Sequence, residues 1–362
     1  MAEAPVTKDA LYTAAPTVKV DGQLNEKVST QLLAMKMCEH EGGMSNLELR
    51  FSNFGSFRGN VADQVFEDDT LLKLGAALAV YAGQVASPTE IFRGKITALE
   101  ARFSAVGPPE LIVLAEDALQ AARMSRHTKT WDNTSLSAIA QQIASGLNLT
   151  PVTSGLDASI GTEQQVNESD LHFLRRLLAR YDADLQVVGT ELHATPRSQA
   201  QRNTLELAMY SQLLEVRVVA DLAHQVTQVT STGWDFKQGQ PISVSSQTTS
   251  LGPGSGQTGK DWLPKAWGTR SEQLANYATA DQSDAQALVD AEFAQRSRQF
   301  VVAHGVSEGN PAVRVGSYLT LKGLGPRFSN TYYTTAAVHR FDMEKGYATE
   351  FTAECAYLGN AQ

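Results

Sequence analysis

One short stretch of the chain, residues 167–185, brings together residue types that can carry out acid–base chemistry. Its sequence, NESDLHFLRRLLARYDADL, contains carboxylates, a histidine and three arginines. General acid–base catalysis needs such groups in a site where they meet a substrate. Here they surround an apolar stripe of Leu171, Leu174, Leu178 and Tyr181 with helical spacing. We therefore expect the charges to cap and solvate a structural helix rather than to form an active site.

The start of this helix is predicted from its polar residues. Asn167 is expected to be the N-cap, because its side chain can accept a hydrogen bond from an N–H two or three residues later. Asp170 then falls at the third helical position, where a carboxylate can reach back as in a capping box. Glu168 joins Asp170 in the first turn, where the helix dipole favours negative charge. These acidic residues have a structural explanation without a substrate.

A second candidate is GSGQTGK at residues 254–260, which matches both G-x-G-x-x-G and G-x-x-x-x-G-K. A phosphate loop needs a buried strand before it and a helix N-terminus after it. The preceding ISVSSQTTS is polar, and the following DWLPKAW contains a proline. Asp261 stands where a serine or threonine would hold magnesium. We interpret residues 245–268 as a long loop.

The remaining candidates lack the spacing that their chemistry requires. The seven histidines form no HExxH or HxH pattern, and Cys38 and Cys355 form no CxxC pair. The acidic pairs lack the glycine and terminal glutamate of a calcium loop, and no G-x-S-x-G stretch occurs. We expect no catalytic residue, no metal and no cofactor, and so a protein that is not an enzyme.

Composition limits the partners of the chain. The 362 residues carry a formal net charge of −9, which disfavours binding along nucleic acid. No run of about 18 apolar residues occurs, so no membrane insertion is expected. The N-terminus lacks a basic start and an apolar core, and so does not resemble a signal peptide. Trp262 and Trp267 lie in the predicted loop, where we expect core packing or an interface with another subunit.

The elements that must position these residues change in character along the chain. Short alternating runs such as MSNLELRFSN, separated by Gly, Pro and Asp, predict strands of a barrel or sandwich. Two helix patterns and a hairpin then predict a small α+β unit, and strand patterns resume after it. The predicted divisions are a flexible N-terminal arm (1–16), a first β-barrel domain (17–125), a small α+β domain (126–200), and a second β-barrel domain (201–362) with the long loop 245–268 and a helix near 281–299.

The two β-regions echo each other weakly. FRGKITALEARFSAVGPPELIVLAEDAL and YYTTAAVHRFDMEKGYATEFTAECAYL both read as strand, turn and strand at the end of a β-region. Their identity is low, and any two hairpins look alike at this level. The echo is suggestive of duplication and no more.

Taken together, these segments resemble one family. QQVNESDLHFLRRLLARYDADLQV resembles the Q-x-N-E-S-D-x-x-F-L-x-R-L signature of VgrG proteins and of the phage late control protein D family. FRGKITALEARF, VTSTGWDFKQGQPI and the terminal VRVGSYLTLKG…GYATEF resemble further family segments in the same order, so that the similarity covers about residues 17–358. The signature residues are Gln165, Asn167, Glu168, Ser169, Asp170, Phe173, Leu174, Arg176 and Leu177.

The resemblance implies a tail hub fold, mainly β, with two similar antiparallel β-barrel domains flanking a small α+β domain. It also implies a homotrimer, whose six barrels join a hexameric tail tube to a trimeric spike and enclose a channel for DNA or protein cargo. The chain ends at GNAQ without β-helix repeats, so we expect the spike to be a separate protein. Other baseplate components would be further partners.

The setting implied is assembly in the bacterial cytoplasm into a phage tail, a tailocin or an injection-system particle, with these three contexts left open. Two other classes of function remain as alternatives. One is a cell-wall-degrading tail protein, and the other is a protein that binds cell walls or carbohydrate. Lysis of peptidoglycan would support the first, and a monomer that binds cell walls would support the second.

Overall fold

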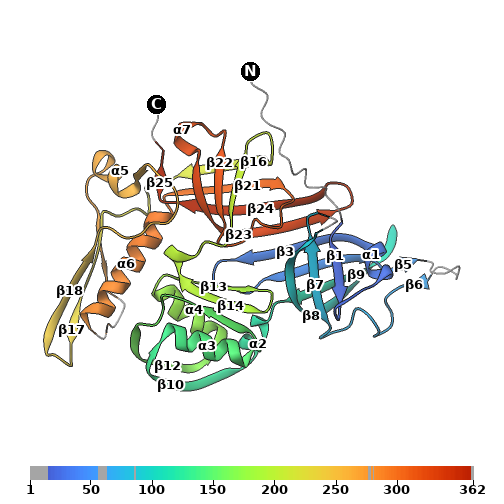
Figure 1. Ribbon diagram of the computed structural model, residues 1–362, viewed down its shortest axis with the longest axis horizontal. Helices are drawn as coiled ribbons and strands as arrows, with labels where there is room; N and C mark the ends of the chain where they lie inside the picture. The colour runs from blue at the N-terminus through green and yellow to red at the C-terminus, as the bar shows by residue number, and fades with distance from the viewer. Residues whose placement is uncertain (1–14, 56–62, 85–86, 276–278, 280, 360–362) are drawn as a thin grey trace.

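The computed structural model describes residues 15–55, 63–84, 87–275, 279 and 281–359. Its main feature is one sheet of thirteen strands that runs through both β-regions, with a small α+β unit and a side sheet set against it (Figure 1). The expected N-terminal arm, residues 1–16, lies outside the described residues except for its last two. In the part of the chain that is described, no helix has the length and apolar character needed to cross a membrane.

The strands of the first β-region alternate buried and exposed side chains. In β4, Leu47, Leu49 and Phe51 point into the core between less buried neighbours, as the sequence period of two predicts. Asp21 and Gly22 both have positive φ, which the tight turn between β1 and β2 requires. The elements are β1 Thr17–Val20, β2 Gln23–Leu24, α1 Glu26–Gln31, β3 Leu32–His40, β4 Asn46–Ser52, β5 Phe54–Gly55, β6 Asp63–Gln64, β7 Ala77–Ala82, β8 Thr89–Ser104 and β9 Gly107–Glu116.

The second β-region is built in the same way around a core of its own. Strands at both ends of its order, β15 and β16, contribute to that core through Leu207 and Leu213. A sheet whose two ends meet in one core must curl around it, and the same holds for β1 and β3 in the first region. The elements are β15 Thr204–Ala208, β16 Leu213–Ala220, β21 Val301–Glu308, β22 Tyr318–Lys322, α7 Gly325–Phe328, β23 Asn330–Asp342 and β24 Gly346–Cys355.

The two β-regions share one strand order. The first region runs β3-β4-β9-β8-β7-β1 across the sheet, and the second runs β16-β21-β24-β23-β22-β15. If the six strands of each region are numbered along the chain, both regions have the order 2-3-6-5-4-1 across the sheet. In both, the fifth and sixth strands form a long hairpin, β8–β9 or β23–β24, at the centre. The pairing differs at one end, since β1 is antiparallel to β7 whereas β15 is parallel to β22. The weak echo in the sequence thus corresponds to a repeated topology.

The small α+β unit lies between the two β-regions in the chain and packs below the sheet in Figure 1. Its core is formed mainly by the apolar faces of α3 and α4 against β13 and β14. The helix predicted in WDNTSLSAIAQQIASGLNL is α3, which is capped by Ser135. The elements are α2 Leu119–Met124, β10 Arg126–Ser135, α3 Leu136–Gly146, β11 Thr150–Thr153, β12 Ser159–Ser169, α4 Asp170–Arg180, β13 Ala183–Val188, β14 Glu191–Pro196 and a 3₁₀ turn Arg197–Gln199.

A side sheet is inserted between β16 and β21 and is covered by a long helix. It comprises β17 Gln228–Asp235, β18 Gln240–Ser246 and β20 Ser271–Leu274, with α6 Gln282–Arg298 packed on it. The prediction of one long loop at residues 245–268 is wrong in part. This segment contains α5 Gly259–Ala266, and β19 Gln257–Thr258 pairs with β25 Tyr357–Leu358.

The mainly β fold with an α+β unit, expected for a tail hub, is confirmed by this architecture and by its structural relatives, described below. The division of the chain into domains at the predicted boundaries stays a prediction.

Candidate functional site

The signature residues build the turn that leads from β12 into α4. Gln165 is buried, and its Nε2 donates to the carbonyl of Glu168 at 2.9 Å and to Oδ1 of Asp170 at 2.8 Å. The indole of Trp131 donates to Oε1 of Gln165 at 3.4 Å. The buried Gln165 side chain therefore binds residues on both sides of the turn. These bonds matter for stability, because an amide buried without partners would be costly.

The predicted cap of α4 is wrong by two residues. Ser169 is the N-cap, since its Oγ accepts from the backbone N–H of His172 at 3.3 Å. Asn167 still belongs to β12 and has φ of 47°, whereas an N-cap has extended backbone. Asp170 is therefore the first helical residue and not the third. Asparagine is one of the residues that tolerate a positive φ, which accounts for its presence before the turn.

The other signature residues lie on opposite faces of α4. Phe173 and Leu174 are fully buried, and the Phe173 ring stacks on Trp131 with 5.8 Å between centroids. On the exposed face, Arg176 Nε lies 3.2 Å from Glu168 Oε1. These contacts give each signature residue a structural place, and any further role stays a prediction.

The glycine-rich segment ends at the N-terminus of α5, where the carboxylate of Asp261 already lies. Thr258 caps the helix, and the Asp261 carboxylate accepts from the Thr258 backbone N–H at 2.9 Å. Burial alone would raise the pKa of Asp261, but the hydrogen bonds from Thr258 lower it. A phosphate would meet a carboxylate here. Gly256 is explained by packing, because a Cβ would lie 2.2 Å from the carbonyl of Leu358.

The two predicted interface tryptophans have different surroundings. Trp262 packs against the core of the second β-region. Trp267, at the end of α5, is 72% exposed. An interface role for either residue stays a prediction, and the exposed ring of Trp267 is the one that has room for a partner.

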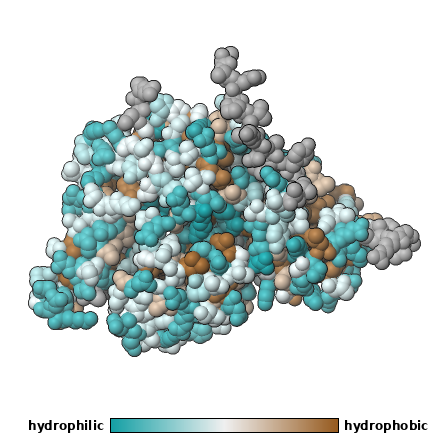
Figure 2. All heavy atoms as spheres, in the orientation of Figure 1, coloured by the Kyte–Doolittle hydropathy of each residue, from teal (hydrophilic) through white to brown (hydrophobic). Residues whose placement is uncertain are grey.

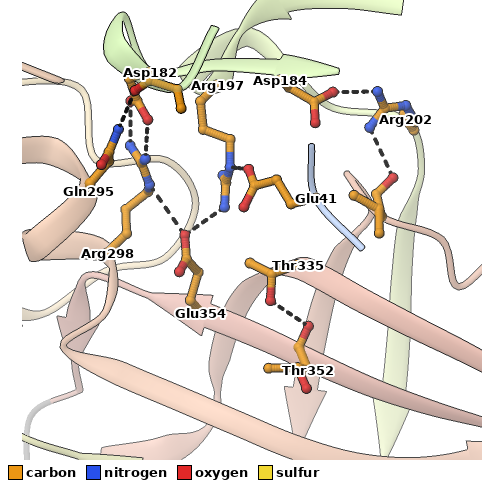
Figure 3. A network of polar contacts seen from close by, with 12 residues as sticks. Glu41, Asp182, Asp184, Arg197, Arg202, Gln295, Arg298, Thr335, Thr352 and Glu354 are labelled. Atoms are coloured by element: carbon orange, nitrogen blue, oxygen red, sulfur yellow. Dashed lines mark hydrogen bonds and ion pairs between the residues drawn. The ribbon is translucent and has the colours of Figure 1, made fainter. Parts of the chain in front are cut away.

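A charged junction between the α+β unit and both β-regions was missed from the sequence (Figure 3). Arg197, 3% exposed, forms ion pairs with Glu41 after β3 and with Glu354 of β24, the latter at 2.6 Å. Its guanidinium lies 3.0 Å from the ring centroid of Tyr333. One side chain thus ties three parts of the chain together. The sequence RSQAQRNT, residues 197–204, is largely polar and gives no sign that Arg197 is buried.

Further charged contacts extend this junction. Arg298, at the end of α6, donates to Asp182 at 2.8 Å and to Glu354 at 3.3 Å. Figure 3 shows these pairs side by side with the Arg197 pairs. Residues of the junction also line a cavity of about 540 Å³ that is open to solvent. The guanidinium groups of Arg197 and Arg298 both have carboxylate partners. The junction is therefore a set of ion pairs that holds the α+β unit and α6 against the β-regions.

A second buried cluster lies where β3 pairs with β23 in the shared sheet. Glu39 of β3 pairs with Arg314 at 2.6 Å and accepts from the backbone N–H of Val315. Burial would raise the pKa of Glu39, but Arg314 holds it below its usual value. His339 of β23 is fully buried, and burial and then Arg314 lower its pKa to about 4. Among the described residues, no group of three His, Cys, Asp or Glu side chains could hold a metal ion.

The sheet has one internal joint, and among the described strands β8 and β16 each leave an edge without a partner. The first half of β23 pairs with β22, and its second half, Ala336–Asp342, pairs with β3. The same place in the first β-region is different, because the second half of β8 pairs with β9 alone. β16, which takes the place of β3, pairs only with β21 among the described strands.

Residues 56–342 match the family described as Alg8 N-terminal domain. The chain belongs to the Alg8 N-terminal domain family. No curated protein matches the sequence. The Alg8 N-terminal domain match covers the larger part of both β-regions and all of the α+β unit.

Solved structures share the fold of this Alg8 N-terminal domain chain at low sequence identity. The 43 kDa tail protein of prophage MuSo2 from Shewanella oneidensis has 11% identity and a TM-score of 0.67, over 94% of this chain and 98% of that one. An E. coli component of the type VI secretion system has 12% identity and a TM-score of 0.58, over 95% and 79%. The VgrG complex of Francisella has 10% identity and a TM-score of 0.54, over 96% and 59%. The resemblance to VgrG-like baseplate hub proteins is confirmed at the level of the fold.

Proposed function

We propose that the chain is a structural baseplate hub protein of a contractile tail or injection system, and that it works as a homotrimer. The observation that carries the proposal is the repeated strand order of the two β-regions. Three chains with two equivalent regions each provide six similar units around an axis. A trimer of this kind can meet a threefold spike on one side and a sixfold tube on the other.

The joint within one chain supplies the pattern for a joint between chains. β23 pairs with β3 so that the two regions form one sheet. The equivalent strands, β8 and β16, both have a free edge, since β16 ends the strand order and the second half of β8 pairs with β9 alone. Pairing of β8 in one chain with β16 in the next repeats the internal joint. Repeated three times, this pairing closes a ring and leaves none of these edges exposed.

One antiparallel register fits the charges of both edges. If Arg102 of β8 lies opposite Glu215 of β16, then Glu100 lies opposite Arg217, because the strands run in opposite directions. All four side chains are on the solvent face of their strands, since Arg102 pairs with Glu110 and Arg217 pairs with His304 in the register of the sheet. Opposite charges in facing positions stabilise a sheet.

The same register also brings apolar side chains together on the other face. Leu99 faces Val218, and Ala101 faces Val216. Phe103 and Leu214 follow at the same edge, where the register of their own strands is irregular. Phe103 and Leu214 are both largely exposed in the single chain, which is unusual for neighbours of a core. Their burial in a trimer would contribute about 25 cal/mol for each Å² of apolar surface removed from water.

In this function the trimer joins the tail tube to a separate spike protein and encloses the channel through which DNA or protein cargo passes. Its role is architectural rather than enzymatic. It would be assembled in the bacterial cytoplasm with the other baseplate components and then form part of a phage tail, tailocin or injection-system particle.

Disulfide trapping tests the trimer directly. Cysteines at Ala101 and Val216, which face each other in the proposed register, should give covalent trimers on oxidation, seen on a denaturing gel. A pair at Ala101 and Val219 is the matched control, because Val219 lies three residues further along on the opposite face. Oxidised chains that stay monomeric, or that stop at dimers, would refute the ring. Wild-type mass by light scattering at increasing concentration supplies the independent reading.

The charges give a second test. Glu215→Arg should weaken the trimer by placing two arginines together, and adding Arg102→Glu should restore it. Glu206→Arg on β15 is the control, since Glu206 is exposed and belongs to neither β8 nor β16. Equal trimer stability in Glu215→Arg and Glu206→Arg would contradict the register.

A further inference from the structure

The α+β unit contains a cavity for which the proposed function has no use. The cavity lies between α2, β10 and α3, is open to solvent, and has a volume of about 430 Å³. The surface of this unit that is visible in Figure 2 is mostly hydrophilic or neutral, whereas one wall of the cavity is apolar. That wall consists of Ala121, Ala122, Ile143 and Leu147. Apolar walls with a few converging polar groups are typical of ligand sites.

The indole ring of Trp131 forms another side of the cavity. The ring stacks on Phe173, with 5.8 Å between centroids, and the ammonium group of Lys129 lies 3.5 Å from the Trp131 ring centroid. Lys129 also lines the cavity. A tryptophan face attracts cations more strongly than the other aromatic rings do. The contact with Lys129 therefore shows that an alkylammonium group fits against this ring.

Two further groups favour positive charge in the cavity. The Asp170 carboxylate lines it, and Oδ1 of Asp170 accepts from Gln165 Nε2 at 2.8 Å and lies 3.0 Å from His127 Nδ1. Both contacts fall on one oxygen, which leaves Oδ2 without a donor among the described residues. Gly146, the last residue of α3, lines the cavity as well, and α3 has no basic residue in its last turn. The C-terminal end of a helix carries partial negative charge, which a cation can balance.

Lys129 itself holds its place against the ring only loosely. Its side chain is exposed, and within the described part of the chain it forms no ion pair with a carboxylate. A single contact between a cation and a ring is weak at an exposed position, and a lysine held in one rotamer loses conformational entropy. Lys129 can therefore leave the ring to a ligand that reaches Asp170 as well.

We propose that this cavity binds the ammonium group of a lysine side chain on a partner protein, and that Lys129 fills the place when the partner is absent. The carbon chain of the bound lysine lies along the apolar wall, and its ammonium lies between the Trp131 ring and the Asp170 carboxylate. The formal net charge of −9 attracts a partner that presents lysines. Every residue of the cavity belongs to the α+β unit, so this inference does not depend on the proposed trimer.

Nuclear magnetic resonance of the indole N–H groups tests the site in the full chain. The chain has four tryptophans, and the Trp131 signal is assigned by its loss in Trp131→Phe. N-acetyl-lysine N-methylamide should shift this signal. N-acetyl-norleucine N-methylamide has the same carbon chain without the ammonium group and should leave the signal in place. Equal shifts with both probes, or no shift with either probe in Lys129→Met, would overturn the proposal.

Four variants separate the site from a merely structural role. Lys129→Met removes the internal competitor and should tighten binding of the lysine probe about fivefold, whereas Asp170→Asn should weaken it about fivefold. Lys265→Met is the matched control, because Lys265 lies 5.1 Å from the ring centroid of Trp262 but belongs to α5. The control should bind the probe like the wild type.

Gly146→Leu is the fourth variant and obstructs the cavity without crowding the core. A Cβ at Gly146 would meet no heavy atom within 4 Å apart from neighbouring backbone, so the variant should fold normally. It should also lose the shift of the Trp131 signal. Wild-type affinity for the lysine probe in both Asp170→Asn and Gly146→Leu would overturn the proposal.

A free diamine is another source of the same chemistry. Cadaverine is the probe for that source, and in Lys129→Met the capped lysine should bind at least as tightly as cadaverine. Tighter binding of cadaverine would identify a site for a small amine and would overturn the assignment to a partner protein.

Discussion

Replacing Arg197 by methionine is the most direct test of the charged junction. The change removes ion pairs to Glu41 and Glu354 and the contact with the Tyr333 ring. Removing one partner of a buried ion pair typically costs about 3–5 kcal/mol, because the remaining charge is buried without compensation. Arg298 stays within 3.3 Å of Glu354, and the Glu41 side chain is one-third exposed. We therefore expect a loss near the lower limit, about 3 kcal/mol.

The assay is urea unfolding followed by circular dichroism, with the slope of the transition compared between variants. Arg340→Met is the matched control, because Arg340 forms an ion pair of similar length with Glu350, at 2.6 Å, but the two side chains are 46% and 40% exposed. Exposed pairs contribute at most about 1 kcal/mol. Adding Glu41→Gln to Arg197→Met should recover part of the loss, since it removes one uncompensated charge. Equal losses for Arg197→Met and Arg340→Met would refute the view that the junction is a buried clamp.

Three further predictions concern α4 and the core. Leu174→Ala should cost about 2–5 kcal/mol in the free energy of unfolding because Leu174 is fully buried, and a negligible loss in urea would contradict the packing of α4. Ser169→Ala should lower the free energy of unfolding by about 1 kcal/mol, because Ser169 is the N-cap. Asn167→Gly should change it by only a few tenths of a kcal/mol, because glycine adopts the φ of 47° at this position easily. A larger loss for Asn167→Gly than for Ser169→Ala would show that Asn167 is the cap. His339 binds a proton more readily in the unfolded chain than in the folded one, because its pKa is lowered to about 4 on folding. The free energy of unfolding should therefore fall by roughly 3 kcal/mol as the pH drops from 6.5 towards 4. His339→Gln should flatten that part of the pH profile, and an unchanged profile would show that other groups cause it.

The strands and helices with a clear apolar period could be predicted from sequence. Leu47, Leu49 and Phe51 alternate in β4, and the stripe of Leu171, Leu174 and Leu178 is buried in α4. These patterns are local, because each residue reports which side of its own element faces the core. The family signature was equally local, since its residues lie within one turn and one helix.

Features that depend on distant residues could not be predicted in this way. Arg197 is buried only because Glu41, Glu354 and Tyr333 come to it from other elements. The cap of α4 depends on a positive φ at Asn167, which the sequence allows but does not require. α5 was missed because Pro264 suggested a break, although a proline within a helix this short removes only one intrahelical hydrogen bond.

The joint between β3 and β23 also affects how the chain folds as it is made. His40 pairs with Ala336, about 300 residues later. At a synthesis rate of roughly 5–20 residues per second, β3 waits for tens of seconds before β23 emerges. During that time β3 has the same open edge that β16 keeps in the finished chain. A neighbouring nascent chain could pair with it in place of β23, so the tertiary joint and the subunit joint compete for one edge, and slow translation or crowded ribosomes would favour swapped oligomers.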